Sequence, residues 1–379
     1  QTAGRYEGRD PYYRDLCCVN LDTGELTELV SSDHEIQSIA QTQMNTQIMW
    51  AWADVSQSNG MSPTGSYAVY TRSRADEVPV SLLINRAGDT ILELETADIS
   101  GLPEGWQWPE PVKLLAADEK TDIYGLVFRP SDFSPEKSYP VVSHVFNTPE
   151  IPWVSKGSFT NGGLFGWNYL DGAALAELGF IVVQIDGRGT TCRNKAFHDE
   201  SYGCAESVSN LDDHVAGIQQ LATRYPYMDM QRVGITTHTT GGPGGLQGLL
   251  QHPDFYKVGV GMMAHDSRLI SASMWGEKYE GLSGPDDDQL YPEMMVEKLQ
   301  GKLLLINGML DVTAPPAIIF RWVEALQKAN KDFDLILLPC LGHLNNGYLV
   351  RRVWDHLVRH LLNEEPPKEF KLTSFVDLL

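Results

Sequence analysis

A stretch near the middle of the chain constrains the fold more than any other. In residues 232–245, a strand-forming segment gives way to a tight polar turn and a glycine-dense helix start, and the apolar run 246–250 follows. This order outlines a strand-elbow-helix unit, in which a nucleophile stands at the top of a hydrolase sheet. An elbow of the form Gly-x-Ser-x-Gly would have serine at position 239, where this chain has Thr239. Thr237 takes the place of the first glycine.

Strand-like and helix-like segments alternate through the second part of the chain. This alternation predicts an α/β fold, with a mostly parallel sheet that has helices on both faces. The strands are rich in Val, Ile and Leu, which suits a sheet buried on both faces. The predicted strands are 123–128, 139–146, 180–185, 233–235, 258–263, 303–306 and 335–338, and the predicted helices are 172–178, 210–224, 244–251, 317–330 and 349–362.

The first part of the chain has the pattern of antiparallel β structure. Two hairpin regions are predicted, one from strands 12–21 and 25–30 and one from strands 66–71, 78–84 and 90–94. This spacing of strands and turns is typical of four-stranded propeller blades. The segment, however, holds strands for only about one and a half blades, whereas a complete propeller typically has 4–8 blades. Residues 36–61 show no period and are interpreted as a loop or insertion.

We therefore divide the chain into two units. Residues 1–105 are predicted to form part of a β-propeller, either as the tail of a longer molecule or resting on another structure, and residues 106–379 are predicted to form the α/β unit. The linker is placed at 101–111, where three prolines disfavour regular structure.

Composition narrows the classes of partner. The 50 acidic and 29 basic residues give a formal charge of -21, which disfavours nucleic acid and anionic membranes. No apolar run reaches the ~18 residues that span a bilayer, and no secretory signal pattern opens the chain. The sequence does not determine the cellular compartment, and it weakly favours a periplasmic or secreted location. The five cysteines are interpreted as buried free thiols, with a Cys192–Cys204 bridge as an alternative.

Three loops after predicted strands carry polar residues in the order nucleophile, acid, base. Thr239 lies in the elbow, Asp311 follows strand 303–306, and His343 follows strand 335–338. An alcohol nucleophile needs a histidine to accept its proton and a carboxylate to orient that histidine. Alternatively, Asp311 caps the following turn, His343 is an ordinary loop histidine, and Thr239 sits in an inert elbow.

Thr239 and Thr237 affect whether this elbow can hold a reactive nucleophile. The nucleophile of an elbow is held in a strained backbone conformation, which is harder for a β-branched residue to adopt. Thr239 is therefore expected to relax the turn. Thr237 adds a branched side chain where close packing of strand and helix favours none.

Several segments together resemble the prolyl oligopeptidase family of serine peptidases, in its dipeptidyl-peptidase-IV-like branch. They are residues 8–14, 62–67, 179–190, 195–199, 252–257, 301–306 and 326–334. The resemblance implies a β-propeller that caps an α/β-hydrolase domain, and a Ser-Asp-His triad that cleaves short peptides, often after proline.

Carried over position by position, the resemblance puts Thr239 at the serine, Asp311 at the acid and His343 at the base. The family's oxyanion-stabilising tyrosine, in a Tyr-Ala-Gly-Pro motif, falls on Phe146, so only the backbone N–H of Thr240 remains as a donor. We therefore expect a pseudopeptidase that binds short peptides or acts in an assembly. The competing hypothesis is an active peptidase that uses Thr239. A homodimer, or an assembly that supplies the missing blades, is a further expectation.

Two patterns suggest a bound group but are incomplete. Residues 241–245 are glycine-rich, yet no Gly-Lys-Ser/Thr follows to form a phosphate cradle. His356 and His360 lie one helical turn apart, but a metal site would need further ligands, so we expect them to be ordinary surface residues. We therefore expect no cofactor and no metal.

Overall fold

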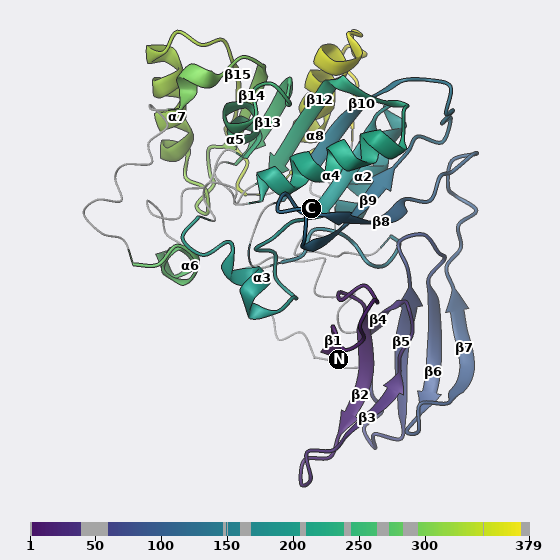
Figure 1. The fold of residues 1–379 in the computed structure, drawn as a ribbon. Helices are drawn as coiled ribbons and strands as arrows, with labels where there is room; N and C mark the ends of the chain where they lie inside the picture. The colour runs from purple at the N-terminus through teal and green to yellow at the C-terminus, as the bar shows by residue number, and fades with distance from the viewer. Residues whose placement is uncertain are drawn as a thin grey trace.

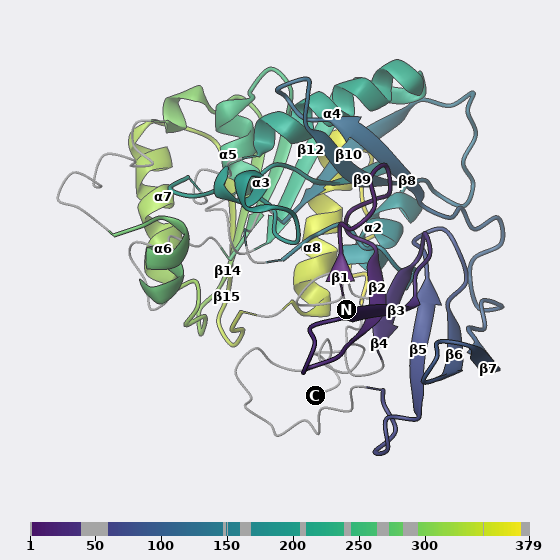
Figure 2. The same cartoon turned by 60° about the horizontal axis from the view of Figure 1, so that its bottom comes forward.

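The structure of the protein is a computed structural model. It describes residues 2–38, 60–146, 149, 151–159, 168–204, 210–238, 244–263, 273–282, 295–343 and 345–372. One large sheet carries helices on both faces, and two small antiparallel sheets lie together at one end of the molecule (Figures 1 and 2).

The large sheet has eight strands in the order β15-β14-β13-β12-β10-β11-β9-β8. The strands from β15 to β11 in this order pair in parallel, whereas β9 is antiparallel to both β11 and β8. The predicted mostly parallel sheet is therefore confirmed. Its strands are β8 Glu110–Leu115, β9 Asp122–Phe128, β10 Tyr139–Val145, β11 Ile181–Asp186, β12 Met228–His238, β13 Val258–Met262, β14 Lys302–Gly308 and β15 Asp334–Leu338.

Both faces of this sheet are buried. Successive residues of a strand point to opposite faces, so Val141 and Val142 belong to two different hydrophobic clusters. Helices α4, α5 and α7 pack in the first cluster, and α2 and α8 pack in the second. The helices are α2 Asn168–Glu177, α3 Lys195–Asp199, α4 Leu211–Arg224, α5 Gly244–Gln251, α6 Ser273–Tyr279, η3 Val296–Lys298, α7 Pro316–Lys328, α8 Gly347–Leu357 and the π-helix η4 Val358–Leu362.

The small sheets contain the predicted hairpins. A three-stranded sheet consists of β1 Thr2–Ala3, β2 Arg14–Val19 and β3 Leu26–Val30. A four-stranded sheet, the size of one blade, consists of β4 Glu35–Ser38, β5 Tyr67–Ser73, β6 Val80–Asn85 and β7 Thr90–Thr96. The β4 strand corrects part of the loop predicted for 36–61, and residues 39–59 lie outside the described part of the chain.

Polar contacts attach the small sheets and the loops beside them to α2 and to the segment before it. Lys156 Nζ lies 2.8 Å from Asp10 Oδ2, and the backbone N–H of Ser158 donates to Ser73 Oγ at 3.0 Å. The hydroxyl of Tyr169, in α2, donates to the backbone oxygen of Ala75 at 2.8 Å. All three contacts are buried or partly buried, so they are protected from competing water.

The proline-rich segment differs from its prediction at one end. Residues 101–111 were expected to be irregular, but residues 110 and 111 belong to β8. Because β8 is the edge strand of the large sheet, the N–H that Pro111 lacks need not cost a ladder hydrogen bond. The short helices α3 and α6 were also not predicted, since they contain too few residues to show a period.

The cysteines are free thiols, and none of the five is buried. The expectation of burial and the alternative of a Cys192–Cys204 bridge are therefore both wrong. In the described part of the chain, no helix is both long and apolar enough to cross a membrane.

His214 lies within α4 and is fully buried, with no hydrogen-bond partner for either ring nitrogen among the described residues. Burial lowers the pKa of His214 from 6.5 to about 4, partly opposed by the charge of Asp213. The unfolded chain therefore takes up a proton at a higher pH than the folded chain does. The corresponding stability is complete above about pH 6.5 and is lost as the pH falls toward 4.

The burial of His214 lets us predict the effect of His214→Met, which replaces the titrating group with an apolar side chain of similar size. When the pH is lowered from about 7 to about 5, the native protein should lose roughly 2 kcal/mol more of its free energy of unfolding than the variant does. Urea unfolding at both pH values measures it. A difference that does not change with pH would contradict the assigned protonation.

Candidate active site

Asp311 and His343 meet at the carboxyl edge of the large sheet. Asp311 follows β14 and His343 follows the neighbouring parallel strand β15, so both loops emerge at the same edge. A Cβ on Gly308 would lie 2.4 Å from the backbone oxygens of Leu341 and Gly342, so glycine is what allows the loops to approach. His343 Nδ1 lies 2.8 Å from Asp311 Oδ2.

The two oxygens of Asp311 have separate partners. The residue is 3% exposed, and its Oδ1 accepts hydrogen bonds from the backbone N–H groups of Thr313, at 2.9 Å, and Ala314, at 2.7 Å. Its Oδ2 faces His343. The carboxylate thus caps the following turn and contacts the histidine as well, so the two interpretations from the sequence do not exclude each other.

This contact determines the tautomer of His343. An ionised carboxylate only accepts hydrogen bonds, so Nδ1 must be the donor. In the neutral ring, Nε2 then carries the lone pair. This is the arrangement that lets a histidine accept the proton of an alcohol.

The other expected catalytic positions are only partly described. Thr239 and Thr240 lie in residues 239–243, outside the described part of the chain. In the sequence, these residues stand between the carboxyl end of β12 and the start of α5. Since β12 runs parallel to β13, and β13 to β14, this end lies at the same sheet edge as Asp311.

Thr237 has a role that sequence reasoning missed. Its side-chain oxygen accepts the backbone N–H of Gly245 at 2.7 Å, which satisfies one of the free N–H groups at the start of α5. The expectation that Thr237 hinders the packing of strand and helix was therefore wrong. The close approach occurs at Gly245, where a Cβ would lie 2.2 Å from the backbone oxygen of Val260.

Phe146 follows β10 and is 5% exposed. Its ring stacks on Trp153, with ring centroids 4.9 Å apart and an interplanar angle of 20°. The indole N–H of Trp153 donates to the backbone oxygen of His144 at 3.0 Å, which holds the stack against β10. A phenyl ring carries no hydrogen-bond donor, so its side chain cannot stabilise a negative oxygen.

Asp186 also shapes this edge, and the sequence analysis did not single it out. It is the last residue of β11, is 1% exposed, and accepts the backbone N–H groups of Trp153, at 2.7 Å, and Val154. Burial raises the pKa of Asp186 to about 6, opposed by Lys156 and by these hydrogen bonds. A carboxylate directly after a buried strand was the available signal. Asp186 positions the segment on which Phe146 stacks.

Comparisons with known proteins identify the family that this chain resembles. The Prolyl oligopeptidase family profile matches residues 168–364. Human Dipeptidyl peptidase 8 is 30% identical over 247 residues, or 64% of this chain and 26% of that protein. Human Prolyl endopeptidase FAP is 22% identical over 293 residues, or 75% of this chain and 37% of that protein.

The fold is also similar to a solved structure. Dipeptidyl peptidase 4 of Porphyromonas gingivalis superposes with a TM-score of 0.72 at 20% identity, covering 92% of this chain and 46% of that one. The chain thus spans about a quarter of human Dipeptidyl peptidase 8 and less than half of the Porphyromonas protein.

From the close contact of Gly245 in α5 with Val260 in β13, we predict the effect of Gly245→Ala. The added methyl group would collide with the backbone of Val260, which cannot rotate away, so the variant should lose about 1–3 kcal/mol of unfolding free energy or more. Gly101→Ala is the matched control, because a Cβ there has no atom within 4 Å. Urea unfolding compares them, and equal stabilities would contradict the close approach.

The contact between Asp311 and His343 predicts the effect of Asp311→Asn. An asparagine can keep an oxygen toward Thr313 and Ala314, but it then turns an NH₂ group toward Nδ1 of His343. The ring should switch to the tautomer protonated on Nε2. Spectra of ¹⁵N-labelled histidine show which nitrogen carries the proton, and an unchanged tautomer would show that Asp311 does not set it.

Proposed function

The chain belongs to the prolyl oligopeptidase family, and we propose that it is a dipeptidyl-peptidase-like protein of impaired catalysis that binds short peptides. The observation that carries the proposal is Phe146. At the position where the resemblance expects a tyrosine hydroxyl, the chain has a buried phenyl ring stacked on Trp153.

The missing hydroxyl has a chemical consequence. Cleavage of a peptide bond places negative charge on the carbonyl oxygen, and peptidases stabilise that charge with two or more hydrogen-bond donors. Removing one such donor costs about 2.7–4 kcal/mol, or roughly 10²–10³ in rate. In this chain only the backbone N–H of Thr240 remains from the expected pair.

The nucleophile adds to this loss. Removing one triad residue from a serine hydrolase costs roughly 10⁴–10⁶-fold in rate. Thr239 keeps a hydroxyl, so the reduction should be smaller than for a complete deletion. Its additional methyl group nevertheless opposes the strained backbone that an elbow requires.

A second candidate function is an active peptidase in which Thr239 attacks the peptide. The observation that favours it is the contact between Asp311 and His343, whose 2.8 Å distance and donor at Nδ1 suit a general base. Both candidates predict that the site recognises short peptides. They differ in whether a bound peptide is cleaved.

The proposal includes an assembly with further propeller strands. Among the described residues, strand β7 is the outer strand of its sheet, and all seven of its residues are exposed, including Ile91, Leu92 and Leu94. An open, apolar strand edge of this kind favours pairing with another strand. We infer that further blades, from a longer form of this polypeptide or from a partner such as a second copy, cover this edge.

The experiment that tests impaired catalysis uses a fluorophosphonate probe and dipeptidyl chromogenic substrates. The native protein should show neither labelling nor turnover, because its nucleophile and oxyanion donor are both altered. Thr239→Ser combined with Phe146→Tyr should restore both signals, and Thr239→Ser alone should restore less. Labelling of native Thr239 that disappears in Thr239→Ala would overturn the proposal in favour of the active peptidase.

A further inference from the structure

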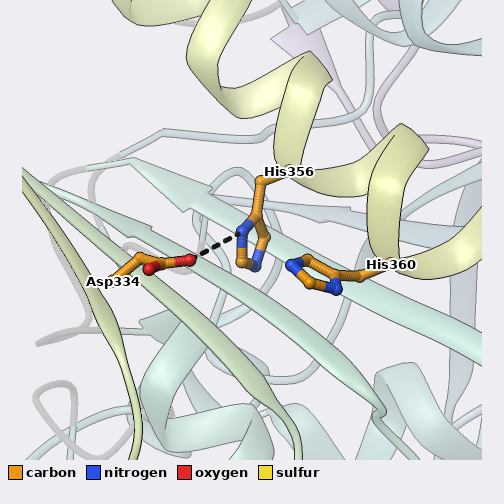
Figure 3. A group of neighbouring side chains, drawn as sticks. All are labelled: Asp334, His356 and His360. Carbon is orange, nitrogen blue, oxygen red and sulfur yellow. Dashed lines mark ion pairs between the residues drawn. The ribbon is translucent and has the colours of Figure 1, made fainter. Parts of the chain in front are cut away.

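Three metal-ligating side chains gather at the edge of the large sheet opposite to His343. Asp334 is the first residue of β15, His356 lies in the last turn of α8, and His360 lies in η4. Figure 3 shows the Asp334 carboxylate and the His360 ring approaching His356 from opposite sides. One ligand atom from each of the three side chains lies within 4.8 Å of the others.

The structure places a third metal-ligating side chain, Asp334, beside the two histidines that the sequence pattern showed. Histidines four residues apart lie on the same side of a helix, and the rings of His356 and His360 are 4.6 Å apart between centroids. Asp334 lies in strand β15, so the spacing of residues along the helix could not reveal it. The expectation that both histidines are ordinary surface residues was wrong for His356, which is 4% exposed.

His356 has a backbone hydrogen bond with Lys302, but one of its ring nitrogens lacks the partner that a buried imidazole requires. Among the described residues, its Nε2 atom has no hydrogen-bond partner. Its Nδ1 atom lies 3.7 Å from Asp334 Oδ2, which is too long for a hydrogen bond. Buried polar nitrogens are normally paired, so an unpartnered one in this position points to a ligand.

The charges around the group favour one class of ion. Two of the three side chains are imidazoles, and the neutral imidazole is the commonest metal ligand in proteins. The charged groups that act on the rings are Asp334, Lys302, Arg359 and Glu365.

The positive charges oppose any cation. Lys302 acts on His360, and Arg359 acts on both rings, although it also lies 3.5 Å from Glu365. A hard ion such as Mg²⁺ or Ca²⁺, which requires several oxygen ligands, is disfavoured. Two imidazoles and one carboxylate suit a transition metal that binds nitrogen strongly.

We propose that Asp334, His356 and His360 bind a divalent transition-metal ion of the zinc type, which holds α8 and η4 to the start of β15. Ligand atoms at ~2.0–2.2 Å from zinc are at most about 4.4 Å apart, so the widest pair must close slightly. The Asp334 side chain is 69% exposed and can make this movement, and the solvent beside it supplies water for the open coordination position.

This site is separate from the candidate active site. Asp334 begins β15 and His343 lies beyond its end, so the five residues of the strand, at ~3.3 Å each, separate the two edges. The metal therefore acts on stability and requires no nucleophile. The inference stands or fails independently of the proposed function.

The test is a titration of the metal-free full chain with Zn²⁺, followed by calorimetry and by thermal unfolding. One equivalent should bind, and the melting temperature should rise. Co²⁺ should give visible absorption bands from nitrogen and oxygen ligands. His360→Asn and Asp334→Asn change partly or largely exposed side chains, so both variants should fold, and each should weaken Zn²⁺ binding at least tenfold.

The matched control is His252→Asn. His252 also lies beside a carboxylate, with Nε2 3.0 Å from Asp212 Oδ1, but it is not part of the three-residue group. This variant should bind Zn²⁺ as the native protein does. The proposal is overturned if the native chain shows no saturable binding, or if His360→Asn and Asp334→Asn bind Zn²⁺ as tightly as the control.

Discussion

The parallel pairing of β14 with β15 is the constraint on which the candidate active site depends. It places two loops at one sheet edge, and Gly308 lets those loops come close enough for Asp311 to reach His343 at 2.8 Å. The same carboxylate accepts hydrogen bonds from the backbone of its own turn, so the scaffold itself holds this side chain in place. The orientation of the His343 ring therefore follows from the contact with Asp311.

The proposed loss of catalysis is compatible with this scaffold. The sheet, its helices and the contact between Asp311 and His343 require no serine at position 239 and no tyrosine at position 146. Phe146 is stabilised by stacking on Trp153, whose segment Asp186 holds in place. Phe146 is thus part of the apolar packing at this edge, while the side-chain oxygen of Thr237 holds the start of α5.

Much of the fold could be predicted from the sequence, because buried parallel strands are continuous apolar runs and helices leave a clear period. The order of Asp311 and His343 after their strands also indicated that the two would lie together. The rest depended on tertiary contacts. The hydrogen bond of Thr237 to Gly245, the edge position of Pro111, and the approach of Asp334 to His356 join residues whose proximity no local pattern specifies.

The central claim is that a branched alcohol at position 239 and a phenyl ring at position 146 leave the site able to hold a peptide but poorly able to cleave it. A high-resolution crystal structure with a short proline-containing peptide bound tests it most directly. The account predicts an intact peptide, with Thr239 Oγ1 outside the ~2.6–3.2 Å range from Nε2 of His343. A Thr239 hydroxyl within that range, together with a second donor facing the peptide carbonyl, would contradict it.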